Sequence, residues 1–289
     1  MAAQACIQGA DSVLSQYARS ACPFLIFREK GIPVPRWRCL ERGTRLLCRR
    51  IASPPHPRGK RNADRVDKIK VGLIGCGFVG GALKTWLDEN NAENCEVLVS
   101  DPPKGLNDSL DGCDVAFVQI HVPTEDDGTQ DLSLMKRLIQ GLPNVPVFVR
   151  TTILPGTSAR LSRETGRRVY YMPEFLTERT YIEDFRKQPM VFPVEGDAAA
   201  LALLTRVFPG KRFTVMSSLE AEITKYAHNV FGAYKVTYFN AVREYCEQMG
   251  ADWAKVHTGC LLSGYINDMH TYVPGPEVTC KGGGSAKTS

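Results

Sequence analysis

The chain has 289 residues, 43% of them hydrophobic, which is enough for one or two buried cores and excludes a fibrous or wholly disordered protein. It has no apolar run near the roughly 18 residues that a membrane-spanning helix needs, so we expect a soluble cytoplasmic protein with no membrane partner. The formal net charge of +5 is uneven, since residues 1–68 carry 14 Lys and Arg against 5 Asp and Glu, a balance of +9 that leaves −4 for the rest. A nucleic-acid partner could bind only those first residues, and none is expected for the acidic remainder.

The ten cysteines are irregularly spaced, and no C-x-x-C pair occurs among them. Five histidines are scattered without the spacing of metal ligands. We therefore predict no metal site and expect reduced thiols, as in other cytosolic proteins.

Residues 1–68 are rich in Arg, Pro and Cys, and the proline-containing run at 53–61 breaks any regular periodicity. We predict a basic, disordered extension here. An organellar targeting peptide, a basic tail that contacts nucleic acid and upstream sequence translated from a misplaced start remain alternatives.

From Ile69 onward apolar strands alternate with helical patterns. This alternation predicts an α/β fold, a Rossmann-like doubly wound parallel sheet with helices on both faces, over residues 69–216. The predicted strands are 69–74, 96–100, 115–120, 145–149 and 169–172, and the predicted helices are 82–89 and 132–140.

The longest helical pattern runs from Leu219 to Met249. Ser217 or Ser218 can cap its start and Gly250 can end it. Because such a helix is too long for an ordinary surface element, we expect a central spine in an all-α dimerisation region, residues 217–275, and a homodimer. One apolar stripe is expected to comprise Leu219, Ile223, Tyr226, Val230 and Tyr234.

A glycine-rich turn follows the first predicted strand and precedes the first helix. Gly75, Gly77 and Gly80 form G-x-G-x-x-G, with Phe78 and Val79 between the last two glycines. The first glycine permits a tight turn, the second lets a pyrophosphate approach the backbone, and the third lets helix and strand pack closely. The turn therefore predicts a dinucleotide site at the start of the helix.

Asp101 ends the second predicted strand, about 20 residues past the last glycine. A carboxylate there accepts hydrogen bonds from both ribose hydroxyls of the adenosine, which favours NAD over NADP. The alternative is an aspartate that opens a turn before Pro102 and Pro103.

Four further segments, in this order, resemble the motifs of the NAD-dependent nucleotide-sugar 6-dehydrogenases, the UDP-glucose/GDP-mannose dehydrogenase family. They are H-V-P-T-E-D-D-G-T-Q-D-L-S at 121–133, similar to the family's V-P-T and D-G-x-x-D-L-S loop, and R-T-T-I-L-P-G-T at 150–157, similar to its S-T-V-x-P-G-T turn. The other two are M-P-E-F-L-T-E at 172–178, similar to its N-P-E-F-L-x-E segment, and K-Y-A-H-N at 225–229, similar to its K-x-x-x-N. The resemblance covers Ile69 to about Gly275. It implies a nucleotide-sugar substrate, but it does not specify which sugar.

The resemblance implies two successive oxidations by NAD, from a C6 alcohol through an aldehyde trapped on a cysteine to a uronic acid. Lys225 and Asn229 would stabilise oxyanions, Glu174 would assist hydrolysis, Thr152 would position water, Glu178 would contact the substrate and Thr124 the cofactor. Lys225 and Asn229 are also four residues apart and share one helix face, as two donors to one oxyanion require.

The carboxylates and histidines leave alternatives open. Glu174 and Glu178 share a face only if their segment is helical, and Pro173 makes a loop equally compatible with the sequence. Thr124 and Thr152 follow strands, where ligands of open α/β sheets bind, although turn chemistry also explains them. His121 and His228 are expected to pack or form hydrogen bonds.

Two features depart from the family pattern. Only about a dozen residues separate Asp101 from the next strand, which predicts an abbreviated sheet. Cys280 precedes its glycines, whereas the family's nucleophilic cysteine follows them, so we do not assign Cys280 as a nucleophile and expect residues 276–289 to be a truncated tail. The chain as printed is therefore expected to bind NAD without forming uronic acid.

Two other functions remain compatible with the sequence. One is a catalytically silent NAD-binding and dimerisation module. The other is a 3-hydroxyacid-type Rossmann dehydrogenase, which also pairs Lys and Asn on a central helix. Dependence of activity on a cysteine distinguishes the predicted enzyme from the second alternative, because oxidation of an alcohol alone needs no thiol.

Overall fold

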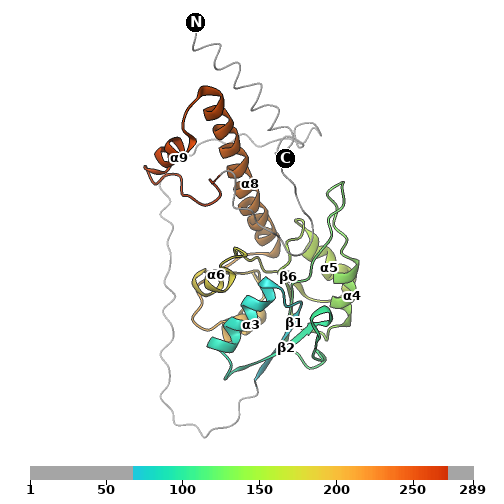
Figure 1. Cartoon of the computed structure of the whole chain (residues 1–289). Coiled ribbons are helices and arrows are strands. Elements are labelled where there is room, and N and C mark those ends of the chain that lie inside the picture. The colour runs from blue at the N-terminus through green and yellow to red at the C-terminus, as the bar shows by residue number, and fades with distance from the viewer. Residues whose placement is uncertain (1–67, 273–289) are drawn as a thin grey trace, which may run out of the picture. The chain divides into compact units, whose positions relative to one another are not determined.

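The computed structural model describes residues 68–272, which form two compact units that divide within one long helix (Figure 1). The first unit comprises residues 68–229 and the second residues 230–272. The predictions on the basic extension, on Cys280 and on the tail from residue 276 lie outside the described residues.

The first unit is built on a six-stranded sheet with the order β3-β2-β1-β4-β5-β6. Five of its strands are parallel, as predicted: β1 (Ile69–Ile74), β2 (Cys95–Asp101), β4 (Val115–Val118), β5 (Val147–Val149) and β6 (Val169–Tyr171). In the register, Ile74 pairs with Ser100 and Val118, and Val149 pairs with Val118 and Tyr171. The carboxyl ends of the five strands therefore meet at one edge.

The edge strand corrects the prediction of a purely parallel sheet. β3 (Leu106–Asn107) pairs antiparallel with the end of β2 and follows the short 3₁₀ turn η1 (Pro102–Lys104). Pro102 and Pro103 have no backbone N–H, so the chain leaves the ladder after Asp101 and turns back. The whole connection from β2 to β4 contains no α-helix.

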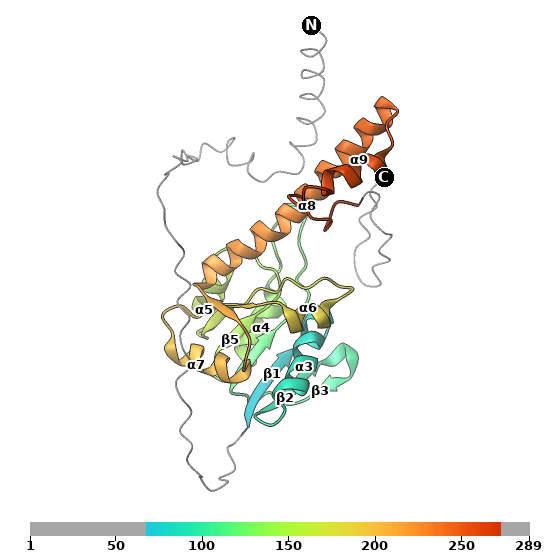
Figure 2. The same ribbon diagram turned by 90° about the vertical axis from the view of Figure 1, so that its left-hand side faces the viewer.

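Helices cover both faces of the sheet, as predicted (Figures 1 and 2). Phe117 and Phe148 point into a core with α3 (Phe78–Asn90), α6 (Tyr181–Lys187) and α7 (Ala198–Val207). Their neighbours Ala116, Val118 and Val149 point into a second core with α4 (Ser133–Gly141) and α5 (Thr157–Thr165). Strands buried on both faces explain the continuous apolar runs in the sequence.

Several short elements were not predicted. Besides α5, α6 and α7, these include a two-stranded parallel sheet of β7 (Met190–Phe192) and β8 (Phe213–Val215). β8 is exposed at all three positions, so it has no buried apolar run like those that marked β5 and β6 in the sequence.

The predicted long helix is α8 (Ser218–Met249), followed by α9 (Trp253–Leu261). Ser217 caps α8: its Oγ accepts from the Glu220 N–H at 3.3 Å, and the Glu220 carboxylate accepts from the Ser217 N–H at 2.8 Å. Gly250 follows the helix with φ +68°, so both predicted ends are confirmed. Among residues 68–272, no helix is long and apolar enough to span a membrane.

Candidate active site

The predicted site residues of the first unit gather at the carboxyl edge of the sheet. The glycine turn follows β1 and Asp101 ends β2. Thr124, Thr152 and Glu174 lie in the loops after β4, β5 and β6. This is the edge at which open α/β sheets bind their ligands.

The structure shows a separate reason for a glycine at each of the three positions of the G-x-G-x-x-G turn. Gly75 has φ +87°, and a Cβ there would lie 2.7 Å from the backbone oxygen of Gln119. A Cβ on Gly80 would lie 2.2 Å from the oxygen of Gly75, so no side chain fits between helix and turn. At Gly77 nothing lies within 4 Å of the Cβ position, which leaves room for a ligand to reach the backbone. The turn therefore fits the pyrophosphate of a dinucleotide.

The amino end of α3 is also suited to bind the pyrophosphate of a dinucleotide. Its N-cap is Gly77, which has no side chain to accept a hydrogen bond from the first N–H groups, and the first turn has no acidic residue. Phe78 is exposed and its ring lies edge-on to Tyr181. The first N–H groups of α3 are thus available to phosphate oxygens, supported by the helix dipole.

Asp101 is tied to the glycine turn. Its Oδ2 accepts a hydrogen bond from the Cys76 N–H at 2.7 Å. Lys104, which the sequence interpretation did not single out, lies 3.9 Å from the same oxygen and donates to the Cys76 carbonyl. These contacts hold the carboxylate beside the turn, where it can face a ribose.

Two glutamines join neighbouring loops, and neither was predicted. The amide of Gln119 donates to the Gly75 oxygen at 3.0 Å. Gln130 pairs with Thr124 in an isolated bridge, donates to the Thr152 oxygen at 3.1 Å and accepts from the Leu154 N–H at 3.0 Å. The sequence did contain a signal for Gln130, because this residue lies inside the loop motif at 121–133. Gln130 links the loop that contains Thr124 to the loop that contains Thr152.

Lys225 and Glu174 form a buried ion pair. The Lys225 Nζ lies 2.9 Å from Glu174 Oε1, and the two side chains are 6% and 9% exposed. Lys225 also donates to the Glu174 backbone oxygen and lies 5.5 Å from the centre of the Phe175 ring. Glu174 Oε2 accepts from the Leu176 N–H at 2.7 Å. Two groups predicted to act on one substrate are thus neutralised by each other in this structure.

The side chains of Lys225 and Asn229 share a helix face but do not meet at one point. Asn229 is exposed, and its Oδ1 lies 3.2 Å from Nδ1 of His228, whose ring packs against Phe175. The i, i+4 spacing fixes the face of the helix, whereas the neighbouring side chains decide where each group points.

Glu178 does not accompany Glu174 on a helix. Residues 172–176 form a loop, in agreement with the alternative that Pro173 suggested, and Glu178 is exposed. The roles predicted for Glu178, Asn229, Thr124 and Thr152 stay predictions.

Glu222 is a buried residue that the sequence interpretation missed. It is 0% exposed, and its carboxylate accepts from the N–H groups of Gly156 at 2.5 Å and Ser158 at 2.8 Å. It therefore caps the start of α5 from α8 and fixes the turn that follows Thr152. Its position three residues before Lys225, on the same helix face, was the available signal.

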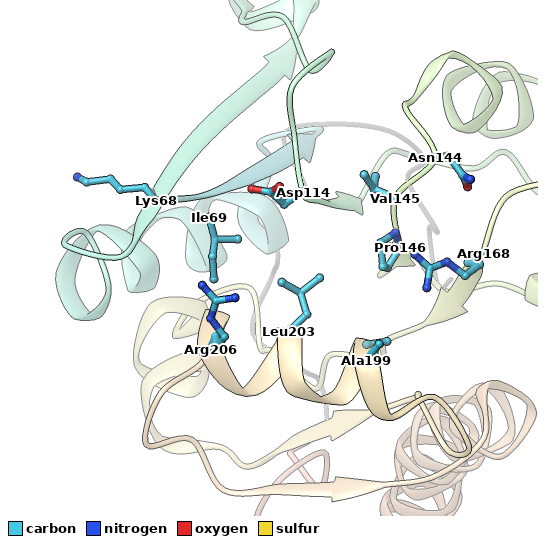
Figure 3. A pocket seen from close by; sticks show the side chains of 11 residues that line it. Lys68, Ile69, Asp114, Asn144, Val145, Pro146, Arg168, Ala199, Leu203 and Arg206 are labelled. Carbon is cyan, nitrogen blue, oxygen red and sulfur yellow. The ribbon is translucent and has the colours of Figure 1, made fainter. Parts of the chain in front are cut away.

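A cavity of about 460 Å³ lies at the opposite, amino edge of the sheet (Figure 3). Its lining includes Asp114, Arg168 and Arg206 but none of the predicted site residues. A smaller cavity of about 20 Å³ lies at the carboxyl edge between Arg150, Glu174 and Gln188. We therefore place the candidate site at the carboxyl edge, where the predicted residues lie.

Comparison with known proteins relates the chain to one family. The model of the UDP-glucose/GDP-mannose dehydrogenase family, central domain, matches residues 219–285. UDP-glucose 6-dehydrogenase of Rhizobium meliloti is 30% identical over 196 residues, which cover 61% of this chain and 45% of that protein. The corresponding enzyme of Pseudomonas aeruginosa is 29% identical over 175 residues, 53% of this chain and 39% of that protein. The chain thus spans less than half the length of these curated relatives.

Two solved structures share the fold. A UDP-glucose dehydrogenase from Pyrobaculum islandicum aligns with a TM-score of 0.60 and 23% identity, over 75% of this chain and 61% of that chain. A ternary complex of GDP-mannose dehydrogenase from Pseudomonas aeruginosa aligns with a TM-score of 0.56 and 21% identity, over 68% and 57%. These likenesses confirm the predicted Rossmann-like fold.

Proposed function

We propose, since this chain belongs to the UDP-glucose/GDP-mannose dehydrogenase family, that it binds NAD and serves the oxidation of the C6 alcohol of a nucleotide sugar. The observation that carries the proposal is the glycine turn, which is open to a ligand only at Gly77 and lies beside Asp101 and the uncapped start of α3. The buried pair of Lys225 and Glu174 lies at the same edge of the sheet.

Each candidate residue would have its own role in binding the cofactor or in the reaction. The backbone at Gly77 and the start of α3 would hold the pyrophosphate, and Asp101 would accept from the ribose hydroxyls. NAD, when bound, accepts the hydride. The Lys225 ammonium would stabilise negative charge that develops on the C6 oxygen, with Asn229 as a second donor. Glu174 and Thr152 are proposed to hold the water for the hydrolysis that releases the acid.

The cofactor preference is the first prediction. We expect NAD to bind at least about tenfold more tightly than NADP, because the Asp101 carboxylate repels a 2′-phosphate. Replacing Asp101 with alanine should weaken NAD binding and abolish the preference, whereas Asp111→Ala, an exposed aspartate in the same connection, should change neither. Calorimetric titration of the purified chain measures both affinities. Equal affinities in the unaltered chain would contradict the assignment.

Turnover tests the rest of the proposal. NADH fluorescence should be followed with UDP-glucose, GDP-mannose and a UDP-N-acetylhexosamine, with uronic acid measured separately. NADH that forms with a nucleotide sugar is expected to disappear in Lys225→Ala, because the ammonium proposed to stabilise the C6 oxygen is lost. A nucleotide sugar that yields two NADH per molecule would show full activity and would require Cys280 to be reconsidered. NADH formation with a simple 3-hydroxyacid would favour the other dehydrogenase class.

A homodimer is the second prediction, and it concerns residues 230–272. Large apolar side chains of this unit are exposed: Phe231 at 64%, Tyr234 at 62%, Leu262 at 82% and Tyr265 at 91%. Such a surface on a small unit favours a protein partner, and a second copy is the partner we propose. Light scattering should give twice the mass of the chain at roughly tens of micromolar. The double change Phe231→Glu with Tyr234→Glu should give the monomer mass, and Lys255→Glu, at an exposed polar position of the same unit, should not.

A further inference from the structure

Lys225 is neutralised in this structure, and its proposed role requires it to be free. Its Nζ is held by the Glu174 carboxylate at 2.9 Å and by the Glu174 backbone oxygen, in a setting where both side chains are at least nine-tenths buried. An ammonium engaged in this way cannot also stabilise a substrate oxyanion at full strength. The Glu174 carboxylate therefore needs a second cation to which it can move.

Arg150 is such a cation. It directly follows β5, its N–H donates to the Val118 oxygen at 2.8 Å, and the residue is 2% exposed. Within the described part of the chain, its Nε and Nη1 have no hydrogen-bond partner. Burial lowers the pKa of its guanidinium to about 10, and the attraction of Glu174 opposes that fall. Arg150 is thus a buried cation with free donors and a carboxylate nearby.

The cavity beside Arg150 is lined by no carboxylate other than Glu174 among the described residues, and burial raises the pKa of the nearby Tyr171 phenol, which keeps it neutral. The Phe185 ring lies 5.2 Å from its guanidinium carbon, and Lys211 lies 4.9 Å from the same ring. Lys211 is itself held by the backbone oxygens of Phe185 and Arg186, and its pKa is lowered to about 8 by burial and by Arg150. Glu174, by contrast, lines the cavity of about 20 Å³ that Arg150 also lines, which has room for one water-sized group.

We propose that Arg150 is a positioning residue for Glu174, and that the Glu174 carboxylate moves from Lys225 to Arg150 across their shared cavity when a substrate oxygen reaches Lys225. The inference rests on the role proposed above for Lys225. In this structure the Glu174 carboxylate pairs with Lys225, while Arg150, a second buried cation beside the same cavity, has Nε and Nη1 without a hydrogen-bond partner among the described residues. The substrate oxygen supplies the second negative charge, so that each cation then has one partner and none is left unpaired.

The exchange is tested by the reactivity of Lys225 in the full chain. Competitive labelling with acetic anhydride, read by mass spectrometry, gives the rate at Lys225 relative to Lys84, which lies in an exposed pair with Asp88. A substrate that shifts Glu174 to Arg150 selects an arrangement that the free chain already populates to a small extent. Arg150→Met should therefore slow labelling of Lys225 by about fivefold, because Glu174 then has no cation other than Lys225 to pair with. If Arg150 had only a structural role, the labelling rate of Lys225 would rise in Arg150→Met, because a loosened core would expose Lys225.

Arg150→Lys keeps the buried charge but loses the planar fork that matches a carboxylate, so it should slow labelling by about twofold. This variant decides the question if Arg150→Met does not fold. In a Glu174→Gln background the effect of either change should vanish. Labelling that is unchanged or faster in both Arg150 variants overturns the proposal. NAD affinity, measured on the same samples, reports on the proposed function separately, because the glycine turn does not involve Arg150.

Discussion

Replacing Glu174 with glutamine is expected to lower the free energy of unfolding by about 3 kcal/mol or more, because it leaves Lys225 and Arg150 as two buried cations without an anion. Urea unfolding at neutral pH, followed by circular dichroism, measures the change. The matched control is Glu183→Gln. Glu183 pairs with Arg186 and Lys187 while about half exposed, so its loss should cost less than about 1 kcal/mol.

The opposite replacement gives a second comparison. Lys225→Met removes the other member of the pair but leaves Arg150 as a partner for Glu174. It should therefore destabilise the protein clearly less than Glu174→Gln. If the two replacements cost the same, Glu174 cannot reach Arg150, and the buried pair is an isolated one.

The second large effect is expected at the glycine turn. Gly80→Ala places a Cβ where the Gly75 oxygen lies 2.2 Å away, so α3 has to move away from the turn after β1. Because the start of α3 and Gly77 are proposed to hold the pyrophosphate, we expect NAD affinity to fall by about a hundredfold, with a loss of stability of about 2 kcal/mol. Calorimetric titration and urea unfolding measure the two changes.

Gly81 offers a control of the same residue type in the same helix. Nothing lies within 4 Å of a Cβ built at Gly81, so Gly81→Ala should retain NAD binding and stabilise the helix by up to about 1 kcal/mol. If Gly80→Ala binds NAD as well as Gly81→Ala does, the close approach of helix and turn is not required, and the assignment of the turn is wrong.

The elements of the fold that a local sequence pattern marks could be predicted from the sequence. β1 was placed at both ends because its apolar run is bounded by a charged stretch and by the glycine turn, and α8 because Ser217 and Gly250 mark its ends. The antiparallel β3 and the pair β7 and β8 were missed. β3 and β8 are exposed along their length, so they lack the buried apolar runs that marked β5 and β6, and β7 is a strand only because it pairs with β8.

Some residues of the candidate site could likewise be identified from the sequence, and others were missed. Gly75, Gly77, Gly80 and Asp101 could be identified from the sequence because backbone sterics and one strand end determine their positions. Arg150, Gln130 and Glu222 were missed, although Gln130 lies in the loop motif and Glu222 on the helix face of Lys225, because the groups around them belong to segments that are distant in the sequence.

The sequence by itself determined the alternation of strands and helices, the tight turn at Gly75 and the face of α8 that carries Lys225 and Asn229, because these depend on backbone geometry over a few residues. Only the tertiary structure decided that the Lys225 ammonium pairs with Glu174 while the Asn229 amide contacts His228. It also decided that Arg150 is buried and that, among the described residues, its Nε and Nη1 have no hydrogen-bond partner. The physical reason is that a side chain's direction and ionic partner depend on burial and on charges brought together from other strands, which no local pattern records.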